Sequence, residues 1–339
     1  MNHADRLKSE GVLPASTIGH PAEDEASSTR DYLRIESCPC CGSPAAKAKC
    51  HIASSPPAEM LSPERHGKFL SGYTSGRVFF TYFKCLDCSA LFCPTYYRQS
   101  QLDGLYGRQA ENMVSIPLPA RQRTQDDYVS FLRRHCRMAG NFLEIGPDIG
   151  LFASSLAKTG SFNHAWLYEP NRNVHHLLSD NLPGLSHTIN ENIFRASDMP
   201  AESVSTAVMI HVLDHVLRPM DLLRQIRTSL EPGGIIFIVT HDCDSLLARV
   251  MGRRWPPYTL QHPQLFSRRS IATLLQLSGF EVIETVKTTN YFPASFLMRA
   301  ALAVYGLSDT VVPGGAASLV PVKLGNIATI ARKPARGPQ

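Results

Sequence analysis

Four cysteines occur as two C-x-x-C pairs, Cys38 with Cys41 and Cys85 with Cys88. Each pair can point two sulfurs at one position, so together the pairs can offer a tetrahedral set of thiolates to one Zn²⁺. Because protein would fill all four positions and leave none for a water molecule, the predicted role of the metal is structural. The simpler alternatives are isolated thiols or a redox pair. Three more cysteines in this region are expected to be bystanders: Cys40, Cys50 and Cys93.

A glycine turn joins an apolar run to a helical pattern in FLEIGPDIGL, residues 142–151. Such a strand, turn and helix bind an adenosine-bearing cofactor, and an acid ending the next strand can accept both ribose hydroxyls. NAD and S-adenosylmethionine are the two contenders. A dinucleotide would place its pyrophosphate beside the carboxylate of Asp148, whereas an ammonium and a sulfonium are compatible with an acidic turn. The predicted cofactor residues are Glu144, Gly146, Asp148, Gly150 and Glu169, with Asn192 as a candidate for the adenine edge that could equally be an exposed loop residue.

Histidines follow the later apolar runs of the sequence, and their pKa near neutrality suits them to move a proton. In an open parallel sheet, residues just past the carboxyl ends of the strands border the ligand. The candidate acids and bases at such positions are His211, His215, Tyr258 and His262, together with His241. The structural alternatives are a strand-end residue for His211 and a helix cap for His215. We favour His262, because its polar loop is flanked by prolines.

The composition describes a globular chain of 339 residues, with 43% apolar and 19% charged residues. These values exclude a wholly disordered chain, and a net charge of +5 is too small to demand a nucleic-acid partner. No stretch approaches the ~20 apolar residues of a membrane span, and the N-terminal residues lack the apolar core of a signal peptide. Seven of the nine cysteines lie between Cys38 and Cys93, which favours a metal site in a reducing compartment over a disulfide framework. The expected location is cytoplasmic.

The elements that must position these residues divide the chain into a flexible tail (1–30), a cysteine module (31–110) and a larger domain (111–339). Within the larger domain, apolar runs alternate with helical patterns, which predicts an α/β fold with a mostly parallel sheet. Strands are predicted at 141–145, 165–168, 187–189, 207–211, 235–240, 280–287 and 324–332, and one at 77–84 in the cysteine module. Helices are predicted at 125–137, 151–159, 171–180, 219–230 and 267–278. An apolar insert at about 290–320 has three interpretations: core, a lid over the acceptor, or a membrane-surface helix.

The larger domain resembles the class I S-adenosylmethionine-dependent methyltransferases, whose first motif is acidic-x-Gly-x-Gly-x-Gly. Glu144, Gly146 and Gly150 match that motif, and Asp148 replaces its middle glycine. The resemblance continues through HVLDHV (211–216), LEPGG (230–234), HPQLFS (262–267) and GFEV (279–282), and so covers about residues 122–332. Val204-Ser205 stands where the small-molecule branch of these methyltransferases commonly has Phe-Asp. The cysteine module is similar to the zinc-binding head that precedes some sugar methyltransferases of natural-product pathways. The resemblance therefore implies a Rossmann-like sheet and a methyltransferase that uses S-adenosylmethionine, with zinc in the head.

Three function classes follow from these observations. The leading one is an S-adenosylmethionine-dependent methyltransferase with a small-molecule acceptor, a sugar or a natural-product intermediate. An RNA-directed methyltransferase is the first alternative, although Lys and Arg are not concentrated around the cysteines. A non-catalytic binding protein with a decayed methyltransferase fold is the second. The sequence leaves open whether O, N or C accepts the methyl group, because loops shape the acceptor pocket.

Overall fold

A computed structural model describes residues 32–61, 66, 77–106, 116–307 and 318–335. The predicted tail at 1–30 lies outside these residues. So does part of the apolar insert, at 308–317.

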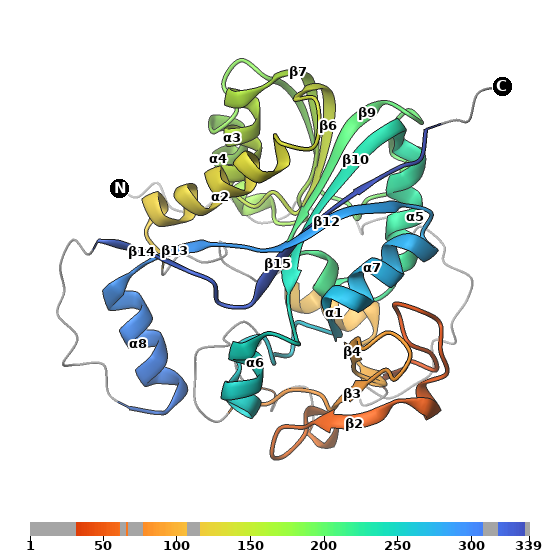
Figure 1. Cartoon of the computed structure of the whole chain (residues 1–339), viewed down its shortest axis with the longest axis vertical. Helices are drawn as coiled ribbons and strands as arrows, with labels where there is room; N and C mark the ends of the chain where they lie inside the picture. Colours follow the sequence, from red (N-terminus) through yellow and green to blue (C-terminus); the bar gives the residue numbers. More distant parts are fainter. Residues whose placement is uncertain (1–31, 62–65, 67–76, 107–115, 308–317, 336–339) are drawn as a thin grey trace, which may run out of the picture. The chain divides into compact units, whose positions relative to one another are not determined.

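A seven-stranded sheet forms the centre of the larger domain, in the order β12-β15-β10-β9-β6-β7-β8 (Figure 1). Neighbouring strands are parallel except that β15 runs antiparallel to both β10 and β12. The expected α/β fold with a mostly parallel sheet is thus confirmed. The strands are β6 (Ala139–Ile145), β7 (Ser161–Tyr168), β8 (Ser186–Asn190), β9 (Val204–Ile210), β10 (Leu230–His241), β12 (Glu281–Lys287) and β15 (Asn326–Arg332).

Helices cover both faces of this sheet because its central strands are apolar on both faces. In β10, Phe237 and Val239 belong to one hydrophobic cluster, and Ile236 and Ile238 belong to another. This period of two sends successive side chains to opposite faces. The first cluster includes α2 (Leu118–Leu132), α3 (Leu151–Thr159) and α4 (His175–Asp180), and the second includes α5 (Pro219–Ser229) and α7 (Arg268–Leu277) (Figure 1).

Most predicted elements occur within a few residues of their expected bounds, and the differences have local causes. The helix expected at 125–137 begins at Leu118, because Pro119 suits a first helical turn, and ends at Leu132. The strand expected at 207–211 ends at Ile210, because His211 has a φ of 52°. In the cysteine module, only Tyr82–Lys84 of the strand expected at 77–84 is paired.

The cysteine module pairs with a segment far along the chain. Its four-stranded sheet has the order β11-β4-β3-β2, and β11 (Gln264–Leu265) comes from beyond β10. The other strands are β2 (Lys49–Ile52), β3 (Tyr82–Lys84) and β4 (Leu91–Phe92), and a separate pair joins β1 (Leu33–Arg34) to β5 (Thr95–Tyr96). One hydrophobic cluster combines Tyr82 and Tyr96 with Trp255 and Tyr258. The module and residues 243–265 therefore share a core, while the division predicted near residue 110 stays a prediction.

The apolar insert begins with β13 (Asn290–Pro293), which pairs with β14 (Leu319–Val322), and continues into α8 (Ala294–Val304). Only Val304 of α8 is buried, and Met298 is 50% exposed. Two other helices are α1 (Gln99–Tyr106) and α6 (Leu246–Met251). Among the described helices, none combines the length and apolar character that a bilayer crossing requires.

Candidate functional site

The glycine turn between β6 and α3 is tightly enclosed. Gly146 has a φ of +68°, and a Cβ there would lie 2.5 Å from Cγ2 of Val212. Gly150 has a φ of +79°, and a Cβ there would lie 2.5 Å from Cδ1 of Leu178. Both positions therefore need glycine for conformation and for space, which explains why the matched motif keeps these two glycines.

Asp148, at the position of the motif's middle glycine, has a φ of 52° and is half-buried. Asp adopts the left-handed region more readily than most residues, so the backbone of the turn is preserved. The Asp148 N–H donates to Oε2 of Glu169 at 2.9 Å, and the Asn171 N–H donates to Oε1 at 2.9 Å. Glu169, at the end of β7, thus holds the turn. Each carboxylate oxygen keeps a second lone pair for a ligand.

Glu144 lies beneath the turn and is only 2% exposed. Its Oε2 has no hydrogen-bond partner among the described residues. Burial, reinforced by the nearby Glu169, raises the pKa of Glu144 to about 8. Burial also raises the pKa of Glu169. Two acids therefore flank the turn, and a cationic ligand would favour their ionised forms. Asn192, by contrast, is exposed just past β8, and its predicted contact with adenine stays a prediction.

The raised pKa of Glu144 predicts a stability that falls with pH. Its folded-state pKa of about 8 exceeds the ordinary value of 4.5, so the folded protein binds this proton more tightly than the unfolded chain does. The resulting contribution to the free energy of unfolding is complete below pH 4.5 and is lost as pH rises to 8. The loss is about 1.4 kcal/mol per unit of pKa difference. Glu144→Gln mimics the neutral acid and should flatten this decline in thermal melts of the ligand-free protein between pH 5 and 9. A decline of equal slope in wild type and variant would assign the effect to other groups.

The candidate histidines converge at the carboxyl ends of β9 and β10. The rings of His211 and His241 have centroids 4.6 Å apart, and those of His241 and His262 are 5.3 Å apart. The ring centroids of His215 and His262 are 4.6 Å apart. The structure therefore brings together three of the four predicted acids and bases, along with His241.

A buried acid that we did not predict, Asp214, lies among these histidines. It is 0% exposed, and Nε2 of His241 lies 3.8 Å from its Oδ2. Burial alone would raise the pKa of Asp214, but the charges of the surrounding histidines lower it on balance. The available signal was the H-x-x-D-H spacing within residues 211–215, which places an acid three residues after one histidine and next to another.

His262 is held in one orientation by its own segment. Its Nδ1–H donates to the carbonyl oxygen of Pro257 at 2.7 Å, which leaves Nε2 with the lone pair. The ring is 5% exposed, and burial lowers its pKa well below the ordinary value. A neutral imidazole with a free Nε2 can accept a proton.

Tyr258 points toward the cysteine module. Its hydroxyl lies 3.2 Å from Nε2 of His51, and its ring packs against Phe79 and Tyr82 with centroids 5.4 and 5.2 Å away. Burial raises its pKa. The structure gives Tyr258 a packing role between the module and residues 243–265, and its role in proton transfer stays a prediction.

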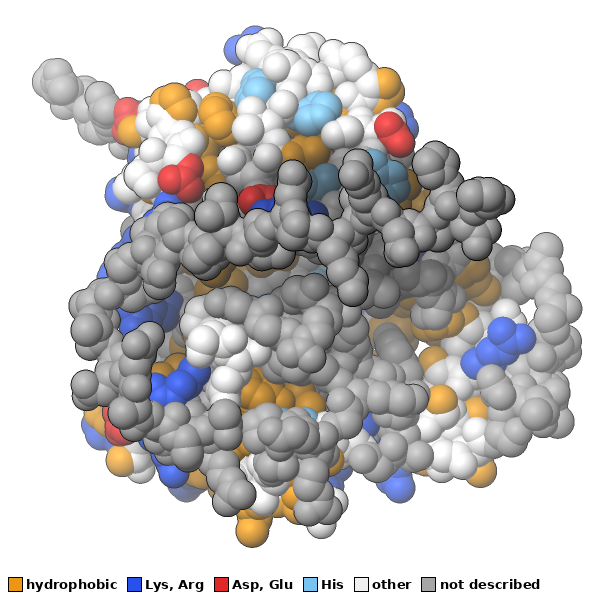
Figure 2. All heavy atoms as spheres, turned by 180° about the vertical axis from the view of Figure 1, so that it is seen from behind, with side chains coloured by type: hydrophobic (Ala, Val, Ile, Leu, Met, Phe, Trp, Pro, Cys, Tyr) orange, Lys and Arg blue, Asp and Glu red, His pale blue; other side chains and the backbone are white. Residues whose placement is uncertain are grey.

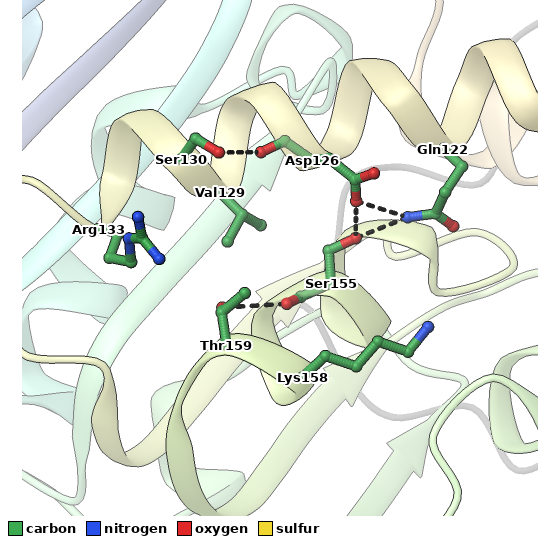
Figure 3. A pocket seen from close by; sticks show the side chains of 8 residues that line it. All are labelled: Gln122, Asp126, Val129, Ser130, Arg133, Ser155, Lys158 and Thr159. Carbon is green, nitrogen blue, oxygen red and sulfur yellow. Dashed lines mark hydrogen bonds between the residues drawn. The ribbon is translucent and has the colours of Figure 1, made fainter.

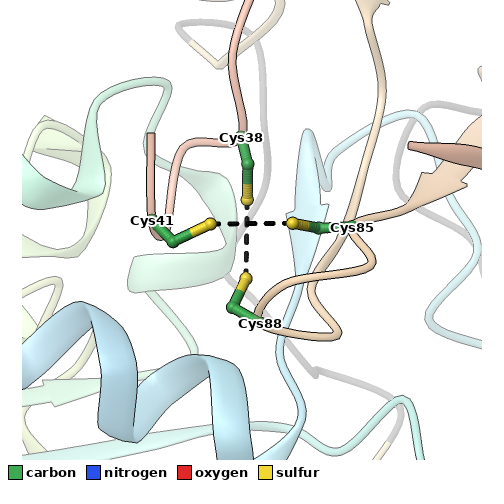
Figure 4. A group of neighbouring side chains, drawn as sticks. All are labelled: Cys38, Cys41, Cys85 and Cys88. Carbon is green, nitrogen blue, oxygen red and sulfur yellow. Dashed lines mark hydrogen bonds between the residues drawn. The ribbon is translucent and has the colours of Figure 1, made fainter. Parts of the chain in front are cut away.

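The four predicted metal ligands form one cluster (Figure 4). The sulfurs of Cys38 and Cys88 are 3.6 Å apart, as are those of Cys41 and Cys85. A tetrahedral zinc with Zn–S bonds of ~2.3 Å requires sulfur–sulfur distances of about 3.8 Å, so the donor set fits zinc. Cys40 is fully buried, with its thiol against Cys38 and Cys88. It therefore lies closer to the cluster than its expected role as a bystander implied.

A separate surface pocket of about 300 Å³ lies between α2 and α3 (Figure 3). Asp126 accepts hydrogen bonds there from Gln122 and Ser155 at 3.0 and 2.6 Å, and Lys158 also lines the pocket. None of the predicted site residues lines this pocket.

Part of the larger domain is similar to known proteins. A family described as methyltransferase domain matches residues 119–285. A search of curated proteins finds no match. Among solved structures, magnesium protoporphyrin IX methyltransferase (ChlM) from Synechocystis PCC 6803 is 13% identical with a TM-score of 0.44, covering 69% of this chain and 93% of its own. The [4+2]-cyclase SpnF is 17% identical with a TM-score of 0.45, covering 62% and 81%.

A third structure, from work on conversion of a disulfide bond into a thioacetal group in echinomycin biosynthesis, is 13% identical with a TM-score of 0.45. It covers 71% of this chain and 94% of its own. The family match agrees with the sheet order and with the glycine turn between β6 and α3. Residues 119–285 of this chain therefore match a methyltransferase domain, and a four-cysteine cluster precedes them.

Proposed function

We propose that the protein is an S-adenosylmethionine-dependent methyltransferase that acts on a small-molecule acceptor. The observation that carries this proposal is the pair of buried acids, Glu144 and Glu169, on either side of the glycine turn. Glu169 would accept the ribose hydroxyls through its remaining lone pairs, and Glu144 would favour a cationic cofactor. When bound, the cofactor supplies an electrophilic methyl group.

The histidines supply the second requirement of methyl transfer, which is removal of a proton from the acceptor. His262 is our candidate base because the carbonyl of Pro257 leaves its Nε2 unprotonated. His215 and His211 are the alternatives, since both lie within the same group of rings. The methyl donor would then lie at the carboxyl end of β6, next to the carboxyl end of its parallel neighbour β9, where the ring of His215 packs against that of His262.

Two alternatives receive less support. On the face drawn in Figure 2, the Lys and Arg side chains that are described lie scattered among hydrophobic and uncharged ones, and the sequence does not concentrate Lys and Arg around the cysteines. The decayed-fold alternative relied on Asp148 and Ser205. Asp148 preserves the turn, and Ser205 lies near the amino end of β9, where its hydroxyl donates to the carbonyl of Ala139 at 2.6 Å. Neither departure disrupts the candidate site.

The test is incubation with S-adenosylmethionine carrying a labelled methyl group and, in parallel, a small-molecule extract or total RNA. We expect label in low-molecular-weight products. Label that enters RNA would show that the acceptor is RNA and not a small molecule. If calorimetry detects no binding of S-adenosylmethionine at high micromolar concentration, the protein does not use this cofactor.

We also propose that Cys38, Cys41, Cys85 and Cys88 hold one structural Zn²⁺. After dialysis against a mild chelator, the wild type should retain about one zinc per chain, because four thiolates form a closed site. Cys38→Ser should lose the ion and lower the melting temperature of the protein. Cys50→Ser is the matched control, since Cys50 is exposed and outside the cluster. Full zinc content in Cys38→Ser would rule out this ligand set.

A further inference from the structure

Three potential metal ligands converge at the ends of β9 and β10. His211, Asp214 and His241 each offer one donor atom, and these atoms all lie within 4.8 Å of one another. Asp214 is 0% exposed, and among the described residues neither of its carboxylate oxygens has a hydrogen-bond partner. Nδ1 of His211 is also buried without a partner among these residues, while its Nε2 lies 3.4 Å from Nδ2 of Asn326. Burying an ionised carboxylate without hydrogen bonds or a cation is strongly unfavourable. A cation bound between these side chains would compensate the charge of Asp214.

Asn326, at the start of β15, orients the side chain of His241, which ends β10. Its Oδ1 lies 2.9 Å from Nδ1 of His241, so that nitrogen carries the proton and donates it. The lone pair of a neutral His241 is then on Nε2, which lies 3.8 Å from Oδ2 of Asp214. With His241 in its neutral form, two hydrogen-bond acceptors therefore face one another across 3.8 Å, which is too long for a direct hydrogen bond but leaves room for a cation between them. An outer-shell amide that fixes a histidine in this way is typical of metal sites.

We propose that His211, Asp214 and His241 form a second metal site, which holds a divalent transition-metal ion. Two imidazole nitrogens and one carboxylate oxygen suit Zn²⁺, Fe²⁺, Mn²⁺ or Co²⁺, and three protein ligands leave coordination positions open. Thiolates are absent from this ligand set, which separates it chemically from the four-cysteine cluster.

The position of the ion relative to His262 indicates a use for the open positions. The ring of His262 lies 5.3 Å from that of ligand His241. The ion would bind a hydroxyl or carboxylate oxygen of the acceptor, and binding to a dication lowers the pKa of a hydroxyl. This use of the ion rests on the proposed function, but the site itself does not. The experiment therefore measures metal binding alone, without cofactor or acceptor.

The probe is Co²⁺, titrated into full-length protein whose cysteines already hold zinc. We expect saturable binding of about one further ion per chain, with visible d–d absorption and without intense sulfur-to-cobalt charge transfer. Asp214→Asn should weaken this binding by more than ~100-fold, because even loss of an outer-shell partner costs ~10–100-fold. His241→Gln provides a second ligand variant, at a side chain that is 22% exposed. His187→Gln, on edge strand β8 and outside the ligand set, should bind as the wild type does.

Three results would overturn the proposal. The first is a wild-type protein that shows no saturable second site at millimolar Co²⁺, which would make Asp214 and His241 a metal-free acid–histidine pair. The second is sulfur-to-cobalt charge transfer in proportion to the second ion, which would place it on cysteines. The third is unchanged affinity in a folded Asp214→Asn or His241→Gln variant. Failure to bind S-adenosylmethionine would leave each of these readouts interpretable.

Discussion

His262→Ala is expected to lower turnover by about 10²–10⁴-fold, the usual contribution of a positioned acid or base. The affinity for S-adenosylmethionine should not change, because the glycine turn and its two acids come from other elements. The physical reason is the fixed tautomer: Pro257 accepts the Nδ1–H of His262, so Nε2 is ready to take a proton from the acceptor. Steady-state kinetics for turnover and calorimetry for cofactor binding measure the two quantities separately.

The comparison variants decide whether the effect is chemical. His262→Gln keeps a side-chain donor for Pro257, so it should preserve the fold of the 257–263 segment while still losing most activity. His187→Ala, on edge strand β8, is the matched control and should behave as the wild type does. A larger loss in His215→Ala than in His262→Ala would move the base to the end of β9. If neither mattered, the acceptor would lose its proton to water or need no base.

Glu169→Ala is expected to weaken binding of S-adenosylmethionine by ~30–150-fold. Two charge-assisted hydrogen bonds to the ribose hydroxyls together contribute about 2–3 kcal/mol to binding. The carboxylate is in place before any ligand arrives, because the N–H groups of Asp148 and Asn171 hold its two oxygens at 2.9 Å each. Calorimetric titration with S-adenosylmethionine measures the change. If Glu169→Ala binds S-adenosylmethionine as tightly as the wild type does, the ribose does not bind to Glu169.

Loss of Glu169 also removes an anchor of the glycine turn, so the direct contact needs its own measurement. S-adenosylhomocysteine and its 2′-deoxy analogue differ only in one ribose hydroxyl. The wild type should prefer the first, and Glu169→Ala should lose most of that preference. A preference that persists in full would mean that Glu169 acts on the turn and not on the ribose. Glu191→Ala, an exposed acid paired with Arg172 just past β8, is the control and should bind both ligands as the wild type does.

Local patterns in the sequence were enough to predict many single elements. Helix α3 occupies its predicted range, 151–159, because Gly150 ends the turn before it and Gly160 follows it. Apolar runs located the buried strands, since burial on both faces leaves no polar alternation to obscure them. The C-x-x-C spacing predicted the cysteine cluster, because each pair lies within a single turn. These features depend on residues that are close together in the chain.

Contacts between distant segments were decided by the tertiary structure alone. The pairing of Gln264 with Phe92 in the module sheet joins segments 172 residues apart, and no local pattern encodes such a register. Asp214 was missed for a related reason. Its sequence neighbours identify it as an acid after a strand, but its importance comes from His241 and Asn326, which belong to β10 and β15. The sequence by itself determined the glycine turn, the thiolate pairs and the order of strands and helices along the chain. The tertiary structure decided which side chains share one buried, low-dielectric site, because parallel strands bring their carboxyl ends together only once the sheet has formed.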